Sequence, residues 1–183
     1  MNERSEELMR MMEVTRKSWD ERVPIHADDQ TGLYDVASFL NGRDTLSPID
    51  NAEIGDVCGL KIAHLQCHFG LDTLSLARRG ADTTGLDYAP AAVAKAQDLA
   101  KQTGQPTKFV CADVYDALDH LPAGAFDMVF STCGVICWLP DLGPWAKVVA
   151  GLLKPGGKLY LSDVHPAMAQ LEEKNDKLVA TYP

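Results

Sequence analysis

Two aspartates and one short turn have the residue types and the spacing to bind a nucleoside. Asp87 and Asp113 each follow a short apolar run, and an irregular turn ending at Gly70 follows an earlier one. Gly70 permits a tight turn, and the N–H groups that open the next helix carry partial positive charge. A carboxylate placed like Asp87 can accept hydrogen bonds from both ribose hydroxyls, and Asp113 can accept one from an adenine amino group.

Taken singly, each of these residues also has an ordinary structural interpretation. Asp87 precedes an expected helix by a few residues and is a candidate helix cap. Asp113 is a candidate solvated loop residue, and one glycine is weak evidence for any site. The three features together, in this order after three successive apolar runs, favour a nucleoside site.

An alternation of strands and helices must position these residues. The pattern predicts strands at residues 60–65, 82–86, 107–111, 126–130 and 158–161, and helices at 71–79, 90–103 and 142–153. Pro90 suits the first turn of its helix, and Gly104 suits its end. Such alternation is typical of a parallel sheet covered by helices on both faces. We therefore expect an α/β fold whose ligand lies beyond the carboxyl ends of the strands.

The first 50 residues have a different character. Residues 6–19 have the spacing of an amphipathic helix that must dock on something, and Pro24 is expected to end it. Its apolar stripe is formed by Leu8, Met11, Met12, Thr15 and Trp19. Turn residues then surround an apolar piece at 34–40. We interpret residues 1–50 as a helix and cap segment, either a lid or a structural extension, and residues 51–183 as the cofactor-binding domain.

Over about residues 57–163 the chain resembles the class I S-adenosylmethionine-dependent methyltransferase family. The resemblance depends on Ile62–Gly70, Gly85–Tyr88, Ala112-Asp113, Phe126–Val129 and Leu153–Gly157. Leu65-Gln66-Cys67-His68, with Gly70, Asp72 and Thr73, is similar to a bacterial subgroup that also carries a segment like Trp19–His26. The resemblance implies a Rossmann-like fold, S-adenosyl-L-methionine as cofactor, and an N-terminal helix that closes over it. The cofactor-binding residues it implies are Gln66, Cys67, His68, Gly70, Asp87, Tyr88, Asp113, Val114 and Ser131.

The chain departs from that family pattern in two ways. His64 stands where the family has an acid, and Gln66 and His68 stand at two glycine positions. Because the cofactor has no pyrophosphate, bare backbone is not demanded there; His64, which we interpret as a packed strand histidine, cannot replace a carboxylate's charge. Residues 164–183 are also too few for the last two family strands. The fifth strand is therefore expected to be an edge, open to a homodimer, unless the chain is a shortened product.

The composition and charge of the chain limit the kinds of molecule that it is expected to bind. The chain has 183 residues and a formal charge of −9, with no basic patch, which disfavours nucleic acid. It has neither a secretion signal nor an apolar run of about 18 residues, so we expect a cytoplasmic protein without a membrane partner. The five cysteines form an irregular set of expected reduced, packed thiols. Cys67-His68 with Cys133 and Cys137 lacks the close pairs of a metal site.

No residue is assigned to catalysis. Methyl transfer from a sulfonium requires chiefly positioning and a dry site. His26, His68 and His165 are candidate bases, although we favour packing or loop roles for each, and Trp138 is either an apolar wall or a core aromatic. The predicted activity is methyl transfer to a small molecule. The alternatives are a catalytically silent nucleoside-binding member and an NAD-dependent dehydrogenase, which Gln66 and His68 disfavour.

Overall fold

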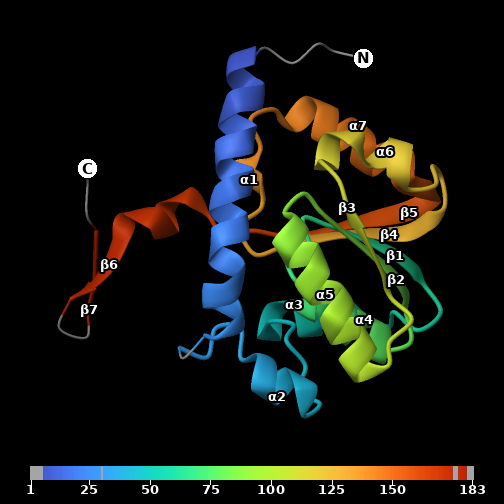
Figure 1. Ribbon diagram of the computed structural model, residues 1–183, viewed down its shortest axis with the longest axis horizontal. Helices are drawn as coiled ribbons and strands as arrows, with labels where there is room; N and C mark the ends of the chain where they lie inside the picture. Colours follow the sequence, from blue (N-terminus) through green and yellow to red (C-terminus); the bar gives the residue numbers. More distant parts are fainter. Residues whose placement is uncertain (1–5, 30, 175–176, 181–183) are drawn as a thin grey trace.

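The computed structural model describes residues 6–29, 31–174 and 177–180. Five parallel strands form its main sheet in the order β3-β2-β1-β4-β5 (Figure 1). Their bounds are β1 Lys61–Leu65, β2 Asp82–Asp87, β3 Lys108–Cys111, β4 Phe126–Thr132 and β5 Leu153–Ser162. The predicted α/β class, with a Rossmann-like parallel sheet, is confirmed.

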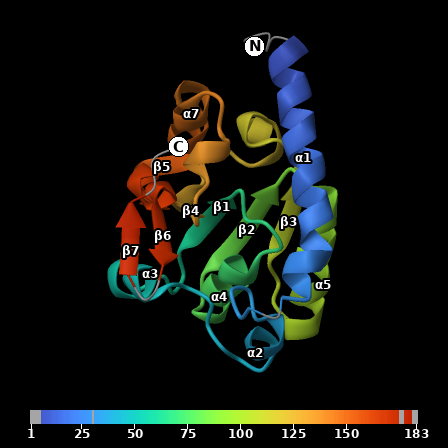
Figure 2. The same cartoon turned by 90° about the vertical axis from the view of Figure 1, so that its left-hand side faces the viewer.

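Helices cover both faces of this sheet (Figures 1 and 2). On one face lie α4 (Leu71–Arg78) and α5 (Pro90–Thr103), and on the other lie α6 (Ala117–His120) and α7 (Leu142–Leu152). Ile62 belongs to a buried cluster on the α4 side, while Ala63 and Leu65 belong to the cluster that contains α7. A strand that is buried on both faces needs a mostly apolar sequence. This explains Ile62, Ala63 and Leu65 of β1, among which His64 is the one polar buried residue.

The register of the central strands aligns their carboxyl ends. Leu65, the last residue of β1, lies opposite Leu86 of β2, and Asp87 of β2 lies opposite Cys111 of β3. Three parallel strands therefore end at the same edge of the sheet. Their following loops must meet there, as the sequence predicted.

The N-terminal helix α1 extends over Glu6–Ala27, so the expectation that Pro24 ends it was wrong. A proline near the end of a helix removes a single backbone hydrogen bond. The carbonyl of Pro24 still accepts from the N–H of Asp28 at 3.1 Å. Buried Val23 and a hydrogen bond from the Ala91 N–H to the Asp20 carboxylate, 2.9 Å long, hold this part of the helix against α5.

Two short helices that were not predicted follow: α2 (Val36–Leu40) and α3 (Pro48–Glu53). Phe39 of α2 is fully buried, and the Arg78 guanidinium lies over its ring at 4.0 Å. Val23 and Phe39 share one buried cluster with α4 and α5. The segment before residue 50 thus packs into the same core, and the division at residue 50 stays a prediction.

At the other end, β5 is an edge of the main sheet, as expected. It begins five residues earlier than predicted because Leu153 pairs with Phe126, after which the register shifts. Two further strands, β6 (Leu171–Lys174) and β7 (Lys177–Ala180), were not predicted. They pair with each other in a hairpin that projects away from the main sheet (Figure 1). The homodimer through β5 stays a prediction.

The remaining short elements are the 3-10 turns η1 (Val114–Asp116), η2 (Ile136–Trp138) and η3 (Pro166–Gln170). In the described part of the chain, no helix combines the length and apolar character needed to cross a membrane. The five cysteines are free, but Cys67 alone among them is buried. The expectation of packed thiols was wrong for the other four, which are exposed: Cys111 ends β3, Cys137 lies in η2, and Cys58 and Cys133 lie in loops.

Replacing Gly85 by alanine should destabilise the fold. A Cβ at this position of β2 would lie 2.6 Å from Phe109 Cδ1 and 2.8 Å from Cys67 Sγ. Overpacking of this kind costs about 1–3 kcal/mol. Urea unfolding should show that loss for Gly85→Ala, and adding Phe109→Leu should recover part of it. An unchanged unfolding midpoint for Gly85→Ala would contradict the tight approach of β2 to the turn after β1.

Candidate functional site

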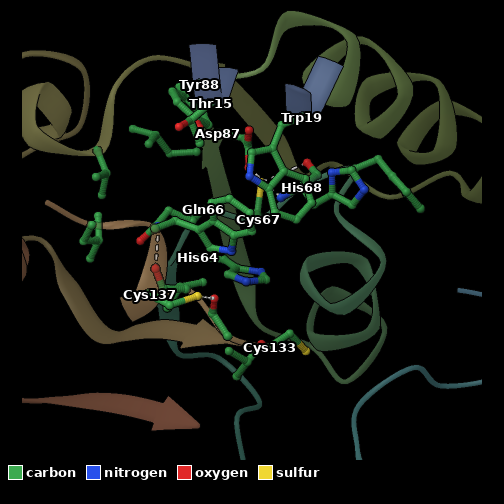
Figure 3. Close-up of a pocket in the computed structure, with 18 of the residues that line it drawn as sticks. Thr15, Trp19, His64, Gln66, Cys67, His68, Asp87, Tyr88, Cys133 and Cys137 are labelled. Atoms are coloured by element: carbon green, nitrogen blue, oxygen red, sulfur yellow. Dashed lines mark hydrogen bonds between the residues drawn. The ribbon is translucent and has the colours of Figure 1, made fainter. Parts of the chain in front are cut away.

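A cavity of about 650 Å³ lies at the carboxyl ends of the strands (Figure 3). It is bounded by the turn after β1, the ends of β2, β3 and β4, and helix α1. Eight of the nine residues predicted to bind the cofactor line it: Gln66, Cys67, His68, Gly70, Asp87, Tyr88, Asp113 and Val114. Residues separated by almost 50 positions in the sequence therefore face one space.

Ser131 is the predicted residue that does not line the cavity. It is fully buried in β4, and its hydroxyl lies 3.5 Å from the carbonyl oxygen of Leu65, to which it donates. The next residue, Thr132, lines the cavity instead. Successive side chains of a strand point to opposite faces, so a shift of one position changes the face.

The turn after β1 has a backbone typical of a glycine-rich turn, although two of its left-handed positions are occupied by Gln66 and His68. Gln66, His68 and Gly70 all have left-handed backbones, with φ of 57°, 50° and 77°. A left-handed conformation costs a residue with a Cβ about 1–2 kcal/mol. Backbone hydrogen bonds hold the turn: the Cys67 N–H donates to the Leu86 carbonyl of β2 at 3.0 Å, and the Gly70 N–H donates to the Cys67 carbonyl at 2.9 Å.

Asp87 ties this turn to β2. Its Oδ2 accepts from the His68 N–H at 2.8 Å, and its Oδ1 accepts from the Ala89 N–H at 2.9 Å. Burial raises the pKa of Asp87 to about 6. Each carboxylate oxygen can accept a further hydrogen bond, and the side chain lines the cavity. Its backbone-anchoring role and its predicted binding role are therefore compatible.

Asp113, like Asp87, both accepts a hydrogen bond from a nearby backbone N–H group and lines the cavity. Its side chain accepts from the Tyr115 N–H at 3.0 Å and so caps the short turn η1. It also lines the cavity, on the β3 side. Asp113 is therefore both a capping residue and a cavity residue, and its predicted contact with an adenine amino group stays a prediction.

Five rings form what we call the aromatic lid: Trp19, His26, Tyr34, His68 and Trp138. The imidazole Nδ1 of His26 lies 3.0 Å from Nε2 of His68, so one ring donates and the other accepts. The Trp19 ring packs edge-on against His68 and Trp138, with centroids 5.3 and 5.2 Å apart, and His26 stacks on Tyr34 at 4.5 Å. These contacts close α1 over the turn after β1.

The histidines of the site are adapted to remain neutral. Burial lowers the pKa of His26, and it lowers the pKa of His68 to about 3. His64 is confirmed as a packed strand histidine: its Nδ1 lies 2.8 Å from the Thr73 hydroxyl, and burial lowers its pKa to about 3. It also borders the cavity, where it supplies no charge at neutral pH.

The structure distinguishes the roles of the two remaining candidate residues, His165 and Trp138. His165 is exposed and its Nδ1 accepts from the Ala167 N–H at 3.2 Å, so it caps η3 as a loop residue. Trp138 lines the cavity and is 42% exposed, which excludes the core interpretation. Across residues 6–29, 31–174 and 177–180, no group of three or more metal-binding side chains is present.

Sequence reasoning missed several cavity residues. Asp72, in the first turn of α4, accepts from the Thr45 hydroxyl at 2.6 Å, and both line the cavity together with Thr132. Asp72 belongs to the motif of the bacterial subgroup, but a carboxylate in the first turn of a helix also suits the helix dipole, so no binding role was assigned to it. The stripe on α1 was recognised, and all its members line the cavity: Leu8, Met11, Met12, Thr15 and Trp19.

Comparison with known proteins identifies the family. A family model described as "Methyltransferase domain" matches residues 63–161. Two curated relatives are named "Ubiquinone biosynthesis O-methyltransferase". The one from Xanthomonas euvesicatoria pv. vesicatoria is 29% identical over 87% of this chain and 61% of its own length. The one from Chromobacterium violaceum is 33% identical over 60% of this chain and 46% of its own length.

A solved structure agrees with this family. The S-adenosylmethionine dependent methyltransferase from Mesorhizobium loti has a TM-score of 0.63 and 26% identity, over 79% of this chain and 66% of that protein. The chain therefore belongs to the family of methyltransferase domains. It spans about half to two thirds of the length of these relatives.

Replacing Gln66 by glycine should relieve the strain in the turn. The left-handed φ of 57° is unfavourable for glutamine and ordinary for glycine. Alanine at this position loses the side chain but keeps the strain, so it is the matched control. Gln66→Gly should be more stable than Gln66→Ala by about 0.5–1.5 kcal/mol in urea unfolding. Equal stability of the two variants would show that position 66 is unstrained.

Proposed function

We propose that the cavity binds S-adenosyl-L-methionine and that this chain is the cofactor-binding part of a methyltransferase for a small-molecule acceptor. The observation that carries the proposal is Asp87. Its carboxylate is fixed by two backbone N–H groups at the end of β2 and faces the cavity. A carboxylate fixed in this place can accept the two ribose hydroxyls, with Asp113 one strand away for the adenine amino group.

The polar and apolar groups of the cavity fit this cofactor. The side-chain Oε1 of Gln66 is buried and has no hydrogen-bond partner among the described residues. Such an acceptor needs a donor, which a hydroxyl or amino group of the ligand would supply. The cavity wall also has apolar side chains that would contact the uncharged parts of a nucleoside: those of Cys67, Leu71 and Leu86.

The acceptor would lie in the outer part of the cavity. Met11, Met12 and Trp138 face the same space as Leu139 and Pro140, so an apolar molecule suits this region. Two relatives named for O-methylation support an oxygen as the methylated atom. S-adenosylmethionine supplies an activated methyl group when bound, so the protein's contribution is to position the two molecules and exclude water. In this proposal the aromatic lid excludes water from the cavity. The resemblance of Trp19–His26 to the segment of the bacterial subgroup suggests the same role for α1.

Calorimetry with S-adenosylmethionine, S-adenosylhomocysteine and NAD tests the proposal. Both sulfur nucleosides should bind, and NAD should not, because Gln66 and His68 occupy the turn that would approach a pyrophosphate. Binding of NAD alone would overturn the proposal. A methyl-incorporation assay with apolar phenols then distinguishes an enzyme from a silent nucleoside-binding protein.

Replacing Asp87 by alanine should weaken nucleoside binding by about 1–3 kcal/mol, because ribose hydroxyls would lose a charged acceptor. Adenosine and S-adenosylhomocysteine should lose affinity to the same extent, since both carry the ribose. Near-ultraviolet circular dichroism is needed as a control because Asp87 also holds the turn. A natively folded Asp87→Ala protein with unchanged affinity would reduce Asp87 to a backbone anchor.

A further inference from the structure

Asp72 is a carboxylate in the cavity wall whose charge is unbalanced. Its Oδ1 accepts from the Thr45 hydroxyl at 2.6 Å, and Thr45 also lies 3.0 Å from the Ser75 hydroxyl. Within the part of the chain that the structure describes, no ion pair includes Asp72. His64, another residue of the cavity wall, is neutral. The groups that hydrogen-bond to Asp72 are thus hydroxyls, and the charged groups that face it are the carboxylates of Asp50 and Asp44.

Holding this carboxylate here is costly. Burial, with repulsion from Asp50 and Asp44, raises the pKa of Asp72 to about 6. A half-buried carboxylate without a cation beside it destabilises the protein relative to its fully solvated state. A neutral residue would serve the packing of α4 better, so the carboxylate indicates a positively charged ligand group.

The place of Asp72 in the cavity separates it from the other two aspartates. Asp87 and Asp113 follow β2 and β3, on one side of β1, whereas Thr132 ends β4 on the other side. Asp72 lies beside Thr132, whose hydroxyl also lowers the pKa of Asp72 by hydrogen bonding. A ligand whose ribose is bound at Asp87 would present its far end to Asp72. Gln66 lines the same cavity; its Oε1 is buried and has no hydrogen-bond partner among the described residues, and its amide nitrogen lies 3.4 Å from the Val135 carbonyl oxygen after β4.

We infer that Asp72 binds the alkylammonium group of the ligand, with Thr45 and Thr132 as the hydroxyls that orient its carboxylate. This inference rests on the proposed function and adds to it the residue that recognises the amino-acid end of the nucleoside. Asp72 is a ligand-binding residue in this account, and it takes no proton from the acceptor.

A comparison of ligands with and without the amino group tests this role. Asp72→Asn keeps the shape and the hydrogen bond from Thr45 but removes the charge. It should weaken S-adenosylhomocysteine about tenfold or more, because a charge-assisted hydrogen bond is lost. The same variant should bind deamino-S-adenosylhomocysteine and 5′-methylthioadenosine within about threefold of the unmodified protein. Asp98→Asn is the matched control, because it makes the same charge change at an exposed position of α5. It should bind all three ligands as tightly as the unmodified protein does.

The outcomes are distinguishable. Equal losses for ligands with and without the amino group would overturn the role of Asp72, while the nucleoside site would stand. No loss for S-adenosylhomocysteine would overturn it as well. Failure of the unmodified protein to bind any of the three nucleosides would overturn the proposed function, and the role of Asp72 with it.

A second readout needs no ligand. The folded pKa of Asp72, about 6, exceeds the ordinary value of 3.8, so the folded state binds its proton more tightly than the unfolded state does. Stability is therefore lost as pH rises from about 4 to about 6. Asp72→Asn should have a higher urea midpoint than the unmodified protein at pH 7, and this advantage should disappear near pH 4. A lower midpoint for Asp72→Asn at pH 7 would show that the carboxylate stabilises the fold and would overturn the inference.

Discussion

The hydrogen bond from the His68 N–H to the Asp87 carboxylate is the interaction on which the site depends. The turn after β1 contains two left-handed residues that carry a Cβ, and such a turn persists only if its surroundings determine it. Asp87 supplies that constraint because the β1–β2 register brings the end of β2 beside the turn. The same bond directs His68 toward α1, where it meets His26 and Trp19. Turn, carboxylate and lid are thus one connected unit.

The cavity built on this unit has chemically distinct regions. Two aspartates border it after β2 and β3, a third lies in α4, and the outer wall is formed by apolar residues of α1 and of the loop after β4. A small molecule that combines a nucleoside, a short linker and a cation would match the first two regions. An apolar acceptor would occupy the third. The lid contacts are mostly between rings, whereas Val23 and the hydrogen bond from the Ala91 N–H to the Asp20 carboxylate hold α1 against the core.

Much of the framework was predictable from the sequence because local patterns determine it. Apolar runs and helical periodicity located the five strands and three long helices to within a few residues, apart from the start of β5. Asp87 and Asp113 were found because strand ends converge in a parallel sheet. Ser131 does not line the cavity, whereas the next residue of β4, Thr132, does, because successive side chains of a strand point to opposite faces. Pro24 was misread because packing of Val23 on the core, a tertiary effect, sustains the last turn of α1.

Features that arise only from long-range contacts were not predictable. The pairing of His26 with His68 joins residues 42 positions apart, and nothing in either local sequence specifies it. Asp72 belongs to the subgroup motif, but it was given no binding role because an acid in the first turn of a helix has a sufficient local explanation, and its contact with Thr45 appears only in three dimensions. The β6–β7 hairpin lies in a polar stretch without alternation, so periodicity gave no signal for it.

A crystal structure of the protein with S-adenosylhomocysteine would test this account most directly. We predict that the ribose hydroxyls lie on the Asp87 carboxylate, the adenine beside Asp113, and the amino group against Asp72, with Trp19 and His26 of α1 covering the ligand. A nucleoside bound outside the cavity, or bound in it with its ribose away from Asp87, would contradict the account.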